Sequence, residues 1–167
     1  MYSLMGTVDL GRAVGFRGYA LNAMTETAGV VVGCLVDTME IGEIELRQFT
    51  EPLALQNGLD FSGVWRGART IRITGTVYDE TRATAFDRLA ALEAIMVPDA
   101  EYVATPASMG FGALTWYPIG GGGLKTINAR SNGLRFAVGR SLFGGDVADP
   151  LAIPWSLTLF AKDPVVF

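Results

Sequence analysis

The chain has 167 residues, of which 50% are apolar and 18% charged, and its formal net charge is −4. This length is enough for one domain with its own core, and the low charged fraction leads us to expect that self-association covers part of the apolar surface. Because Lys and Arg are scattered through an acidic chain, the composition excludes a basic surface that would bind nucleic acid tightly.

The N-terminal segment, residues 1–28, is weakly patterned. Its short apolar pieces are interrupted by glycines at positions 6, 11, 15 and 18. Without a period of two or 3.6, the pattern predicts an irregular or extended N-terminal arm, which could pack on a neighbouring molecule.

A continuous apolar run at residues 30–36 is rich in β-branched side chains and predicts a strand covered on both faces. Cys34 lies inside this run and is the single cysteine of the chain, so an internal disulfide framework is excluded. We expect Cys34 to be a buried structural thiol and not a reactive one.

An acidic segment at residues 37–40 predicts a short turn, after which the apolar residues of 41–46 predict a second strand that could complete a hairpin. The carboxylates of this segment could in principle bind a hard cation. Their spacing lacks the glycine-centred frame of a calcium loop, however, so a solvated turn is the preferred interpretation.

Residues 49–67 predict a long loop, since proline, asparagine and several glycines punctuate them, yet the segment is strongly apolar. It could fold onto its own domain or form an arm that reaches a neighbouring subunit. We prefer the arm because the whole chain is apolar. The candidate interface residues are then Phe49, Phe61 and Trp65, which we expect to be buried between subunits or between rings.

The clearest local signal is at residues 70–78, where Ile71, Ile73 and Val77 alternate with polar residues. This alternation predicts a half-buried strand. Arg72 falls on its polar face, and we expect this side chain to point toward a lumen or a neighbour and not into the core.

A helix is predicted over residues 79–97, between Asp79, whose carboxylate can accept amides of the first turn, and Pro98, which cannot continue a helix. Three- and four-residue steps define its apolar stripe. The stripe consists of Phe86, Leu89, Leu92, Ile95 and Met96.

The remaining strands are predicted at residues 113–117, 124–130 and 134–138 and in a last segment around 155–160. Four glycines at 120–123 and the Ser-Asn-Gly step at 131–133 predict turns. The glycines precede Lys125 as in a phosphate-binding loop, but Leu124 intervenes and no helix follows, so a hairpin turn is preferred.

These elements predict a mainly β protein with one α-helix: an antiparallel β-sandwich or split barrel, with the helix packed on the sheet. The chain has no histidine, which removes the usual general base and the commonest metal ligand. We therefore expect no enzyme activity, no catalytic residue, no metal and no cofactor. No apolar run approaches the ~18 to 20 residues of a membrane-spanning helix, so no membrane insertion is expected.

Two segments together resemble a known family. The first has Asn-Gly at 57–58, then Trp-Arg-Gly-Ala-Arg-Thr-Ile-Arg-Ile-Thr-Gly-Thr-Val at 65–77 and Leu-Ala-Ala-Leu at 89–92. The second is Leu-Thr-Leu-Phe-Ala-Lys-Asp-Pro at 157–164. Their order and spacing resemble the distal tail protein family of long, flexible-tailed phages, in which a G-x-R-x-I-x-I-x-G strand precedes the helix.

The resemblance implies a single tail-ring domain over 1–167 with the split-barrel fold of tail-tube proteins. It implies a hexameric ring at the tail tip of the virion, assembled in the host cytoplasm. Its partners would be the tail-tube protein and the hub or baseplate proteins, and DNA would pass through the channel without specific binding. Many family members continue into a carbohydrate-module-like domain, which we do not expect here.

Two other functions stay open. The chain could be the major tail-tube protein, which stacks into many rings. In a different class, it could be a small-ligand-binding β-barrel, if the apolar strand faces enclose a cavity.

Overall fold

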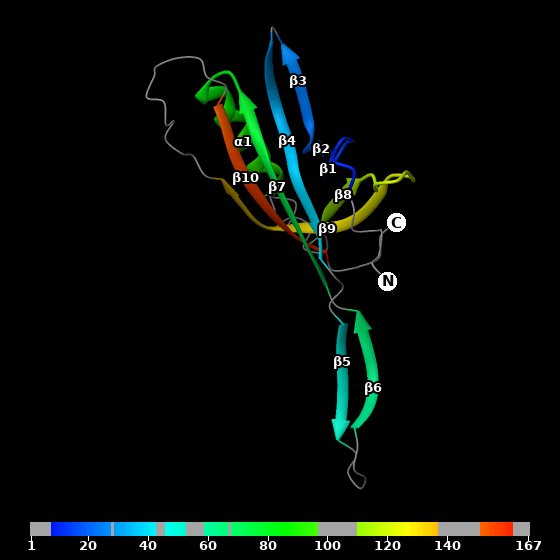
Figure 1. Cartoon of the computed structure of the whole chain (residues 1–167). Helices are drawn as coiled ribbons and strands as arrows, with labels where there is room; N and C mark the ends of the chain where they lie inside the picture. The colour runs from blue at the N-terminus through cyan, green and yellow to red at the C-terminus, as the bar shows by residue number, and fades with distance from the viewer. Residues whose placement is uncertain are drawn as a thin grey trace.

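The computed structural model describes residues 8–27, 29–42, 46–52, 59–66, 68–96, 110–136 and 151–161. The elements in this part of the chain are one helix and ten strands (Figure 1). They are β1 (Gly15–Phe16), β2 (Tyr19–Ala20), β3 (Ala23–Thr27), β4 (Val30–Ile41), β5 (Leu46–Pro52), β6 (Leu59–Arg66), β7 (Arg69–Asp79), α1 (Arg82–Met96), β8 (Gly112–Trp116), β9 (Lys125–Phe136) and β10 (Leu151–Ala161).

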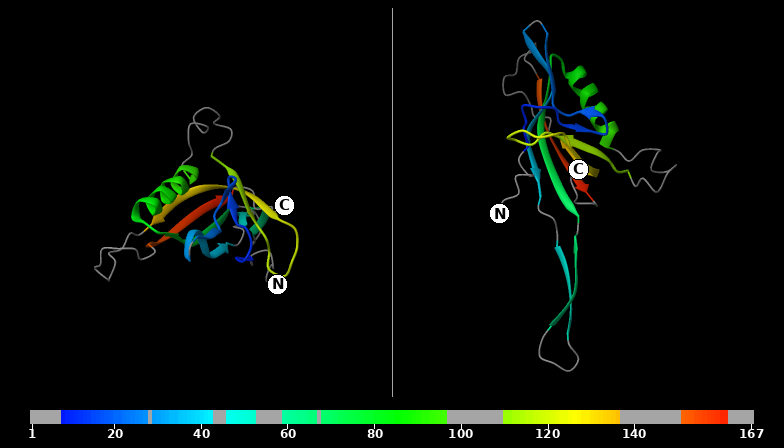
Figure 2. Two further views of the ribbon diagram at one scale, coloured as in Figure 1. Left: turned by 90° about the horizontal axis from the view of Figure 1, so that it is seen from above. Right: turned by 90° about the vertical axis from the view of Figure 1, so that its right-hand side faces the viewer.

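Eight of these strands form one sheet in the order β2-β1-β8-β9-β10-β7-β4-β3, and every pairing in it is antiparallel. The sheet curls into a nearly closed barrel, with α1 against it (Figure 2). The predicted mainly β fold with a helix on an antiparallel sheet is therefore confirmed.

Strand β9 joins the two halves of the barrel. Its residues 125–129 pair with β8, and its residues 130–136 pair with β10. Between Ser131 and Gly133, which lie opposite Leu159 and Thr158, Asn132 is an extra residue. A bulge of this kind bends a strand and increases its twist, so β9 can leave one half of the sheet and enter the other (Figure 2).

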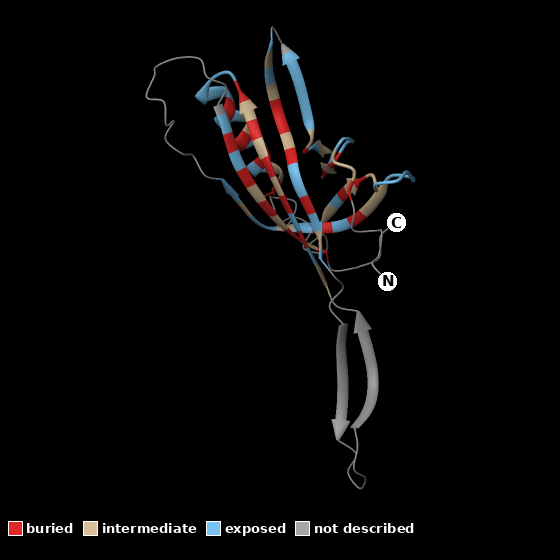
Figure 3. Ribbon diagram, in the orientation of Figure 1, coloured by how far each residue is buried: buried red, intermediate tan, exposed pale blue. Residues whose placement is uncertain are grey.

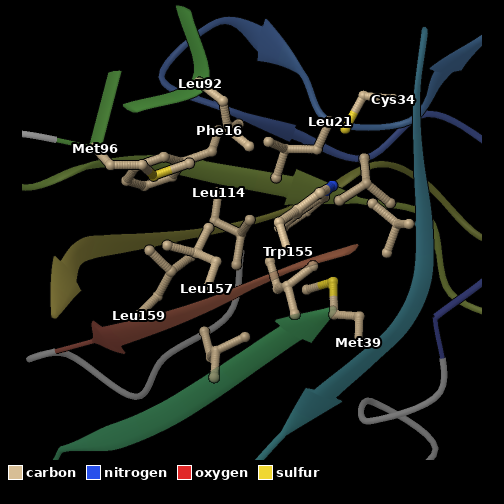
Figure 4. Packing of buried hydrophobic residues seen from close by; sticks show 14 of the residues in the cluster. Phe16, Leu21, Cys34, Met39, Leu92, Met96, Leu114, Trp155, Leu157 and Leu159 are labelled. Atoms are coloured by element: carbon tan, nitrogen blue, oxygen red, sulfur yellow. The ribbon is translucent and has the colours of Figure 1, made fainter. Parts of the chain in front are cut away.

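The core lies inside the curled sheet and under α1. Along β4, β7 and β10, buried residues alternate with less buried ones (Figure 3). Trp155 lies in the middle of the cluster, surrounded by side chains from β1, β4, β8 and α1 (Figure 4). The largest fully buried side chains are Trp116, Phe16, Leu21, Ile71, Ile73, Leu89, Leu92, Leu114, Ile127, Ile153, Leu157 and Leu159.

The helix begins later than predicted, at Arg82, because Thr81 is its N-cap: the Thr84 amide donates to Thr81 Oγ1 at 3.2 Å. Its buried face consists of Ala85, Leu89, Leu92 and Met96. The predicted stripe was wrong at Phe86, which is 40% exposed. With 3.6 residues per turn, a residue next to Ala85 lies about 100° away from the buried face.

Two predicted turns are bulges inside continuous strands. The acidic segment 37–40 does not separate two strands but belongs to β4, where Asp37 is an extra residue between Val36 and Thr38, opposite Gly75 and Thr74. The Ser-Asn-Gly step likewise lies within β9. Both turn predictions were wrong, because Asp and Asn suit the irregular backbone of a bulge as well as that of a turn.

Two other segments are more regular than predicted. Residues 8–27 of the expected arm carry β1, β2 and β3, and they contribute Val8, Val14, Phe16 and Leu21 to the core. Strands this short have no detectable period. The expected loop over 49–67 contains most of β5 and β6, which pair with each other as a two-stranded sheet.

Candidate assembly interface

The outer face of the sheet, turned away from the core, is rich in hydroxyl groups on β4, β7 and β10. Thr38 and Thr74 lie opposite each other and share a hydrogen bond of 2.6 Å. The Thr76 hydroxyl donates to Asp37 Oδ2 at 2.9 Å. These bonds across strands hold the polar face in one arrangement, with the bulge residue Asp37 as an acceptor.

Arg72 lies on this same face. It is exposed, and its register partners are Glu40 on β4 and Thr158 on β10. The inward neighbours Ile71 and Ile73 are fully buried, so the strand alternation keeps Arg72 out of the core of its own chain. Whether it points to a lumen or to a neighbour stays a prediction.

Charge is distributed unevenly across the outer face. The β3–β4 side carries the exposed acids Glu26, Asp37 and Glu40. The β9 side carries the exposed cations Arg130 and Arg135, whose register partners on β10 are Phe160 and Ser156. An acidic side and a basic side on one sheet are complementary between copies placed side by side.

Each side of the sheet also has a partly unpaired strand edge in the described residues. β3 covers only residues 30–34 of β4, so residues 35–41 pair with β7 alone, and the Val36 amide donates to Asn22 Oδ1 at 3.3 Å. β8 covers only residues 125–129 of β9, so residues 130–136 lie beside β10 alone. Unpaired edges of this kind can accept a strand from another molecule.

The hairpin of β5 and β6 is inserted between the paired strands β4 and β7. The Gly42 amide donates to the Thr70 oxygen at 2.9 Å, so the β4–β7 ladder continues toward the base of the hairpin. Figures 1 and 2 show the hairpin standing away from the rest of the sheet.

The three predicted aromatic interface residues lie on this hairpin. Phe49 is opposite Gly63, Trp65 is opposite Arg47, and Phe61 is opposite Thr50. Their side chains lie outside the described residues, so their burial in an interface stays a prediction. The structure brings them onto one hairpin, whereas Arg72 lies on β7 of the barrel sheet, two residues after Thr70 at the base of the hairpin.

Sequence reasoning missed two features that bear on assembly. The unpaired edges depend on strand register, for which the sequence carries no local signal. The loop of residues 117–124 between β8 and β9 carries two exposed apolar side chains, Ile119 and Leu124. The sequence predicts a turn at the glycines between them, and it also shows an apolar residue on each side of that turn.

Buried titratable groups have structural partners. Asp79 is 4% exposed, and its Oδ1 accepts hydrogen bonds from the Glu80 amide at 2.8 Å and the Thr84 hydroxyl at 2.6 Å. Its Oδ2 accepts one from Arg88 Nε at 2.5 Å. Burial acts to raise the pKa of Asp79, but these bonds and the Arg88 charge outweigh it and hold that pKa below its ordinary value.

Cys34 is buried, as predicted, and burial raises the pKa of its thiol to about 11. The indole N–H of Trp155 is near the thiol and acts weakly in the opposite direction. A neutral buried thiol packs as a small apolar group.

Among the residues that the structure describes, no three of Asp, Glu and Cys lie together in a way that would hold a metal ion. In the same residues, no helix is long and apolar enough to cross a membrane.

No protein-family model matches the sequence, and no curated protein matches it. Among solved structures, the chain is similar to the SPP1 Dit (gp 19.1) protein, described as a paradigm of the hub adsorption apparatus in phages that infect Gram-positive bacteria. The TM-score is 0.57 at 14% sequence identity, over 92% of this chain and 51% of that one. The chain thus spans about half the length of the SPP1 protein, and the likeness shows a shared fold.

Proposed function

We propose that this chain is a structural component of a phage tail or of a phage-like particle, and not an enzyme. In detail, it would form a hexameric ring at the tail tip, between the tail tube and the hub or baseplate. The ring would line the channel through which DNA leaves. The observation that carries the proposal is the fold shared with SPP1 Dit, whose published description is that of a hub protein.

The sheet edges support a ring of identical copies. In the described residues, β4 has an unpaired edge on one side of the sheet and β9 has one on the other. Two such edges on opposite sides suit a head-to-tail contact that closes into a ring and leaves no edge exposed. The acidic β4 side and the basic β9 side would add electrostatic attraction between neighbours.

The outer sheet face would then line the channel. Its hydroxyl groups are neutral, and some already have partners in the same sheet: Thr38 and Thr74 bond to each other, and Thr76 donates to Asp37. The exposed charges of this face balance, with Glu26, Asp37 and Glu40 against Arg72, Arg130 and Arg135, so the wall as a whole would offer little net charge to hold a phosphate backbone, and DNA could slide past. Arg72 would point into this lumen or toward the adjacent copy.

The β5–β6 hairpin would be the arm that reaches a neighbouring subunit or ring. Its aromatic residues Phe49, Phe61 and Trp65 would be buried there, since aromatic side chains contribute most per residue to an interface. Burial of these residues between copies would also agree with the high apolar fraction of the chain.

The proposal is tested by the oligomeric mass and by electron microscopy of the purified protein. We expect closed rings of uniform size. Long stacked tubes would favour the major tail-tube protein instead, and a monomer at all concentrations would contradict any ring. A ligand-binding β-barrel has no specific observation in its favour, because side chains such as Trp155, Phe16 and Leu114 fill the interior (Figure 4).

The arm is tested separately by Trp65→Ala, with Arg66→Ala on the same strand as the matched control. We expect Trp65→Ala to shift size-exclusion elution toward the monomer and the control to elute like the parent chain. Unchanged assembly of Trp65→Ala would contradict the interface role of the arm.

A further inference from the structure

We propose that the β8–β9 tip, residues 117–124, is a contact element that seats on the outer face of helix α1 of a second copy. The inference rests on the proposed self-association and names the surfaces that mediate it. Neither surface was identified from the sequence.

The tip presents apolar side chains that its own chain does not cover. Ile119 is 58% exposed and Leu124 is 48% exposed, the two highest values among the large apolar residues described. Between them, Gly120, Gly121 and Gly122 have φ angles of 88°, 91° and 128°, a backbone that side chains rarely tolerate. The glycines let the chain turn sharply, so that both apolar side chains are carried at the end of the hairpin.

The base of the tip is firmly held. Pro118 forms a β-bridge with Val8, and the Asp9 amide donates to the Tyr117 oxygen at 2.8 Å. The Arg12 guanidinium lies 3.7 Å from the centre of the Tyr117 ring. A projection with a fixed base loses little conformational entropy when it binds, which suits a docking element.

The outer face of α1 offers a matching surface. Phe86 is 40% exposed, and its neighbours on that face, Ala83 and Ala90, are exposed and small. Residues three and four apart lie on one side of a helix, so the two alanines flank Phe86 along a shallow apolar strip. Such a strip leaves room for the larger Ile119 and Leu124 side chains.

Charges around the two surfaces are complementary. The exposed residues on and beside α1 include three acids, Glu80, Asp87 and Glu93, against the single cation Arg82, while Arg88 is paired with Asp79.

Around the tip, by contrast, basic side chains outnumber acidic ones. Arg12 and Lys125 lie at its base with one acid, Asp9, whose Oδ1 accepts a hydrogen bond from the Gly11 amide. A basic tip in a chain of net charge −4 fits an acidic helix of a second copy better than it fits an anionic lipid surface.

The two surfaces cannot meet within one molecule. Figures 1 and 2 show α1 and the tip on opposite sides of the barrel. In Figure 1 the tip lies beyond β8, with β4 between it and α1, while α1 packs against β7, β9 and β10. A contact between unlike surfaces on opposite sides is head-to-tail, so it propagates from copy to copy, as the proposed contact between sheet edges does.

The experiment uses three variants of the full chain. One changes the tip, Ile119→Glu/Leu124→Glu. The other two, Phe86→Glu and Ala90→Glu, change the strip on α1. Ala91→Glu is the matched control, because Ala91 is exposed on α1 but lies about 140° around the helix from Phe86, outside the proposed strip. Light scattering coupled to size exclusion gives the mass, and circular dichroism checks that each variant is folded.

We expect the tip variant and the two strip variants, Phe86→Glu and Ala90→Glu, each to lose the assembled species, and Ala91→Glu to keep it. An equimolar mixture of tip and helix variants should form dimers and nothing larger, because only one intact tip and one intact helix face can then meet. Variants that assemble like the parent, or a mixture that stays monomeric, would overturn the inference. If the variants assemble like the parent, the ring proposal survives and only the contact between the tip and α1 is overturned. A parent chain that is itself monomeric would overturn both proposals.

Discussion

At the scale of single residues, the centre of the barrel depends on a position with no side chain. A Cβ atom at Gly75 would lie 2.3 Å from the Leu35 oxygen and 2.4 Å from the Trp155 ring. Only glycine therefore lets the indole pack this closely against β7, and Gly75 and Trp155 are register partners. Trp155 and Gly75 therefore pack as a pair, in which the missing side chain at position 75 makes room for the indole.

We expect Gly75→Ala to lower the free energy of unfolding by about 2 kcal/mol or more, since the added methyl group must displace backbone or an indole ring. Gly133→Ala is the matched control, because a Cβ at this strand glycine meets nothing within 4 Å. Urea unfolding monitored by Trp fluorescence measures both. Equal stability of the two variants would contradict the packing argument.

The buried thiol of Cys34 gives a prediction for the stability of the protein at alkaline pH. Its pKa of about 11 lies above the ordinary 9.0, so the unfolded chain releases the thiol proton first. Stability should be unaffected well below pH 9 and should fall by roughly 2 to 3 kcal/mol as the pH rises toward 11.

Unfolding free energies measured from pH 8 to 11 should therefore fall more steeply for the parent chain than for Cys34→Ala. Slow reaction of the native thiol with an alkylating reagent at pH 8 should accompany this result. If the unfolding free energies of the two proteins had the same pH dependence, the thiol would have the same pKa in the folded and in the unfolded chain.

At the scale of elements, the junction between β7 and α1 is held by a buried carboxylate. Asp79 was predicted to cap the helix, yet its Oδ1 and Oδ2 bind Thr84 and Arg88 within the helix while Thr81 is the N-cap. The carboxylate thus ties the end of the strand to the first two turns of the helix.

We expect Asp79→Asn to cost about 2 kcal/mol, because hydrogen bonds to an ionised group are strong. The lowered pKa of Asp79 means that its contribution is present above the ordinary carboxyl pKa and is lost as the pH falls through the folded-state pKa. The parent should lose stability below about pH 5 more steeply than Asp79→Asn. Asp87→Asn, which changes an exposed carboxylate on the same helix, is the matched control at neutral pH and should leave the free energy of unfolding close to that of the parent.

The other end of α1 is held from a distant turn. Arg17, with φ of 50°, donates from its guanidinium to the Ile95 oxygen at 3.2 Å and to the Gly110 oxygen at 2.9 Å. The last turn of α1 has no basic residue of its own, so Arg17 supplies the positive charge that a helix C-terminus favours.

Arg17→Ala should therefore lower the unfolding free energy by about 1 to 2 kcal/mol, as measured by urea denaturation. Arg82→Ala, at the opposite end of the helix, should change it little. If Arg82→Ala lowered the free energy of unfolding as much as Arg17→Ala does, the capping role of Arg17 would be contradicted.

The elements show how far the sequence predicts this fold. Alternation located β7 and β10 and the 3.6 period located α1, because these signals are local. The signals at Asp37 and Asn132 were ambiguous, since both residue types suit turns and bulges, and only pairing with β7 and β10 decides between them. The unpaired edges arise because pairing with β3 ends at Cys34 and pairing with β8 ends at Ala129, and neither limit has a local signal in the sequence.

At the scale of the whole molecule, Asn22 links the two ends of the curled sheet. Its Nδ2 donates to the Leu10 oxygen at 2.5 Å and to the Arg12 oxygen at 3.1 Å, while Oδ1 accepts from Val36. One side chain thus connects the segment before β1 with the bulged part of β4, which lie at opposite ends of the strand order.

We expect Asn22→Ala to lower stability by about 2 kcal/mol, because it leaves three backbone groups without this partner. In hydrogen-exchange measurements, the Val36 amide should exchange much faster, while the central amides of β7 and β10 should change only with global stability. Ala20→Ser on β2, at an exposed position, is a neutral control. Uniform acceleration at all amides would indicate general destabilisation instead of local opening.

The position of the β5–β6 hairpin has a consequence for how related chains can vary. The hairpin extends a ladder that is already fixed at Gly42 and Thr70, so its length is independent of the register of the barrel. Adding two residues to each strand would lengthen its reach by about 7 Å and preserve which side chains share a face, whereas adding one would exchange the faces. Evolution could thus tune the span between this body and its neighbour in discrete steps, without redesigning either one.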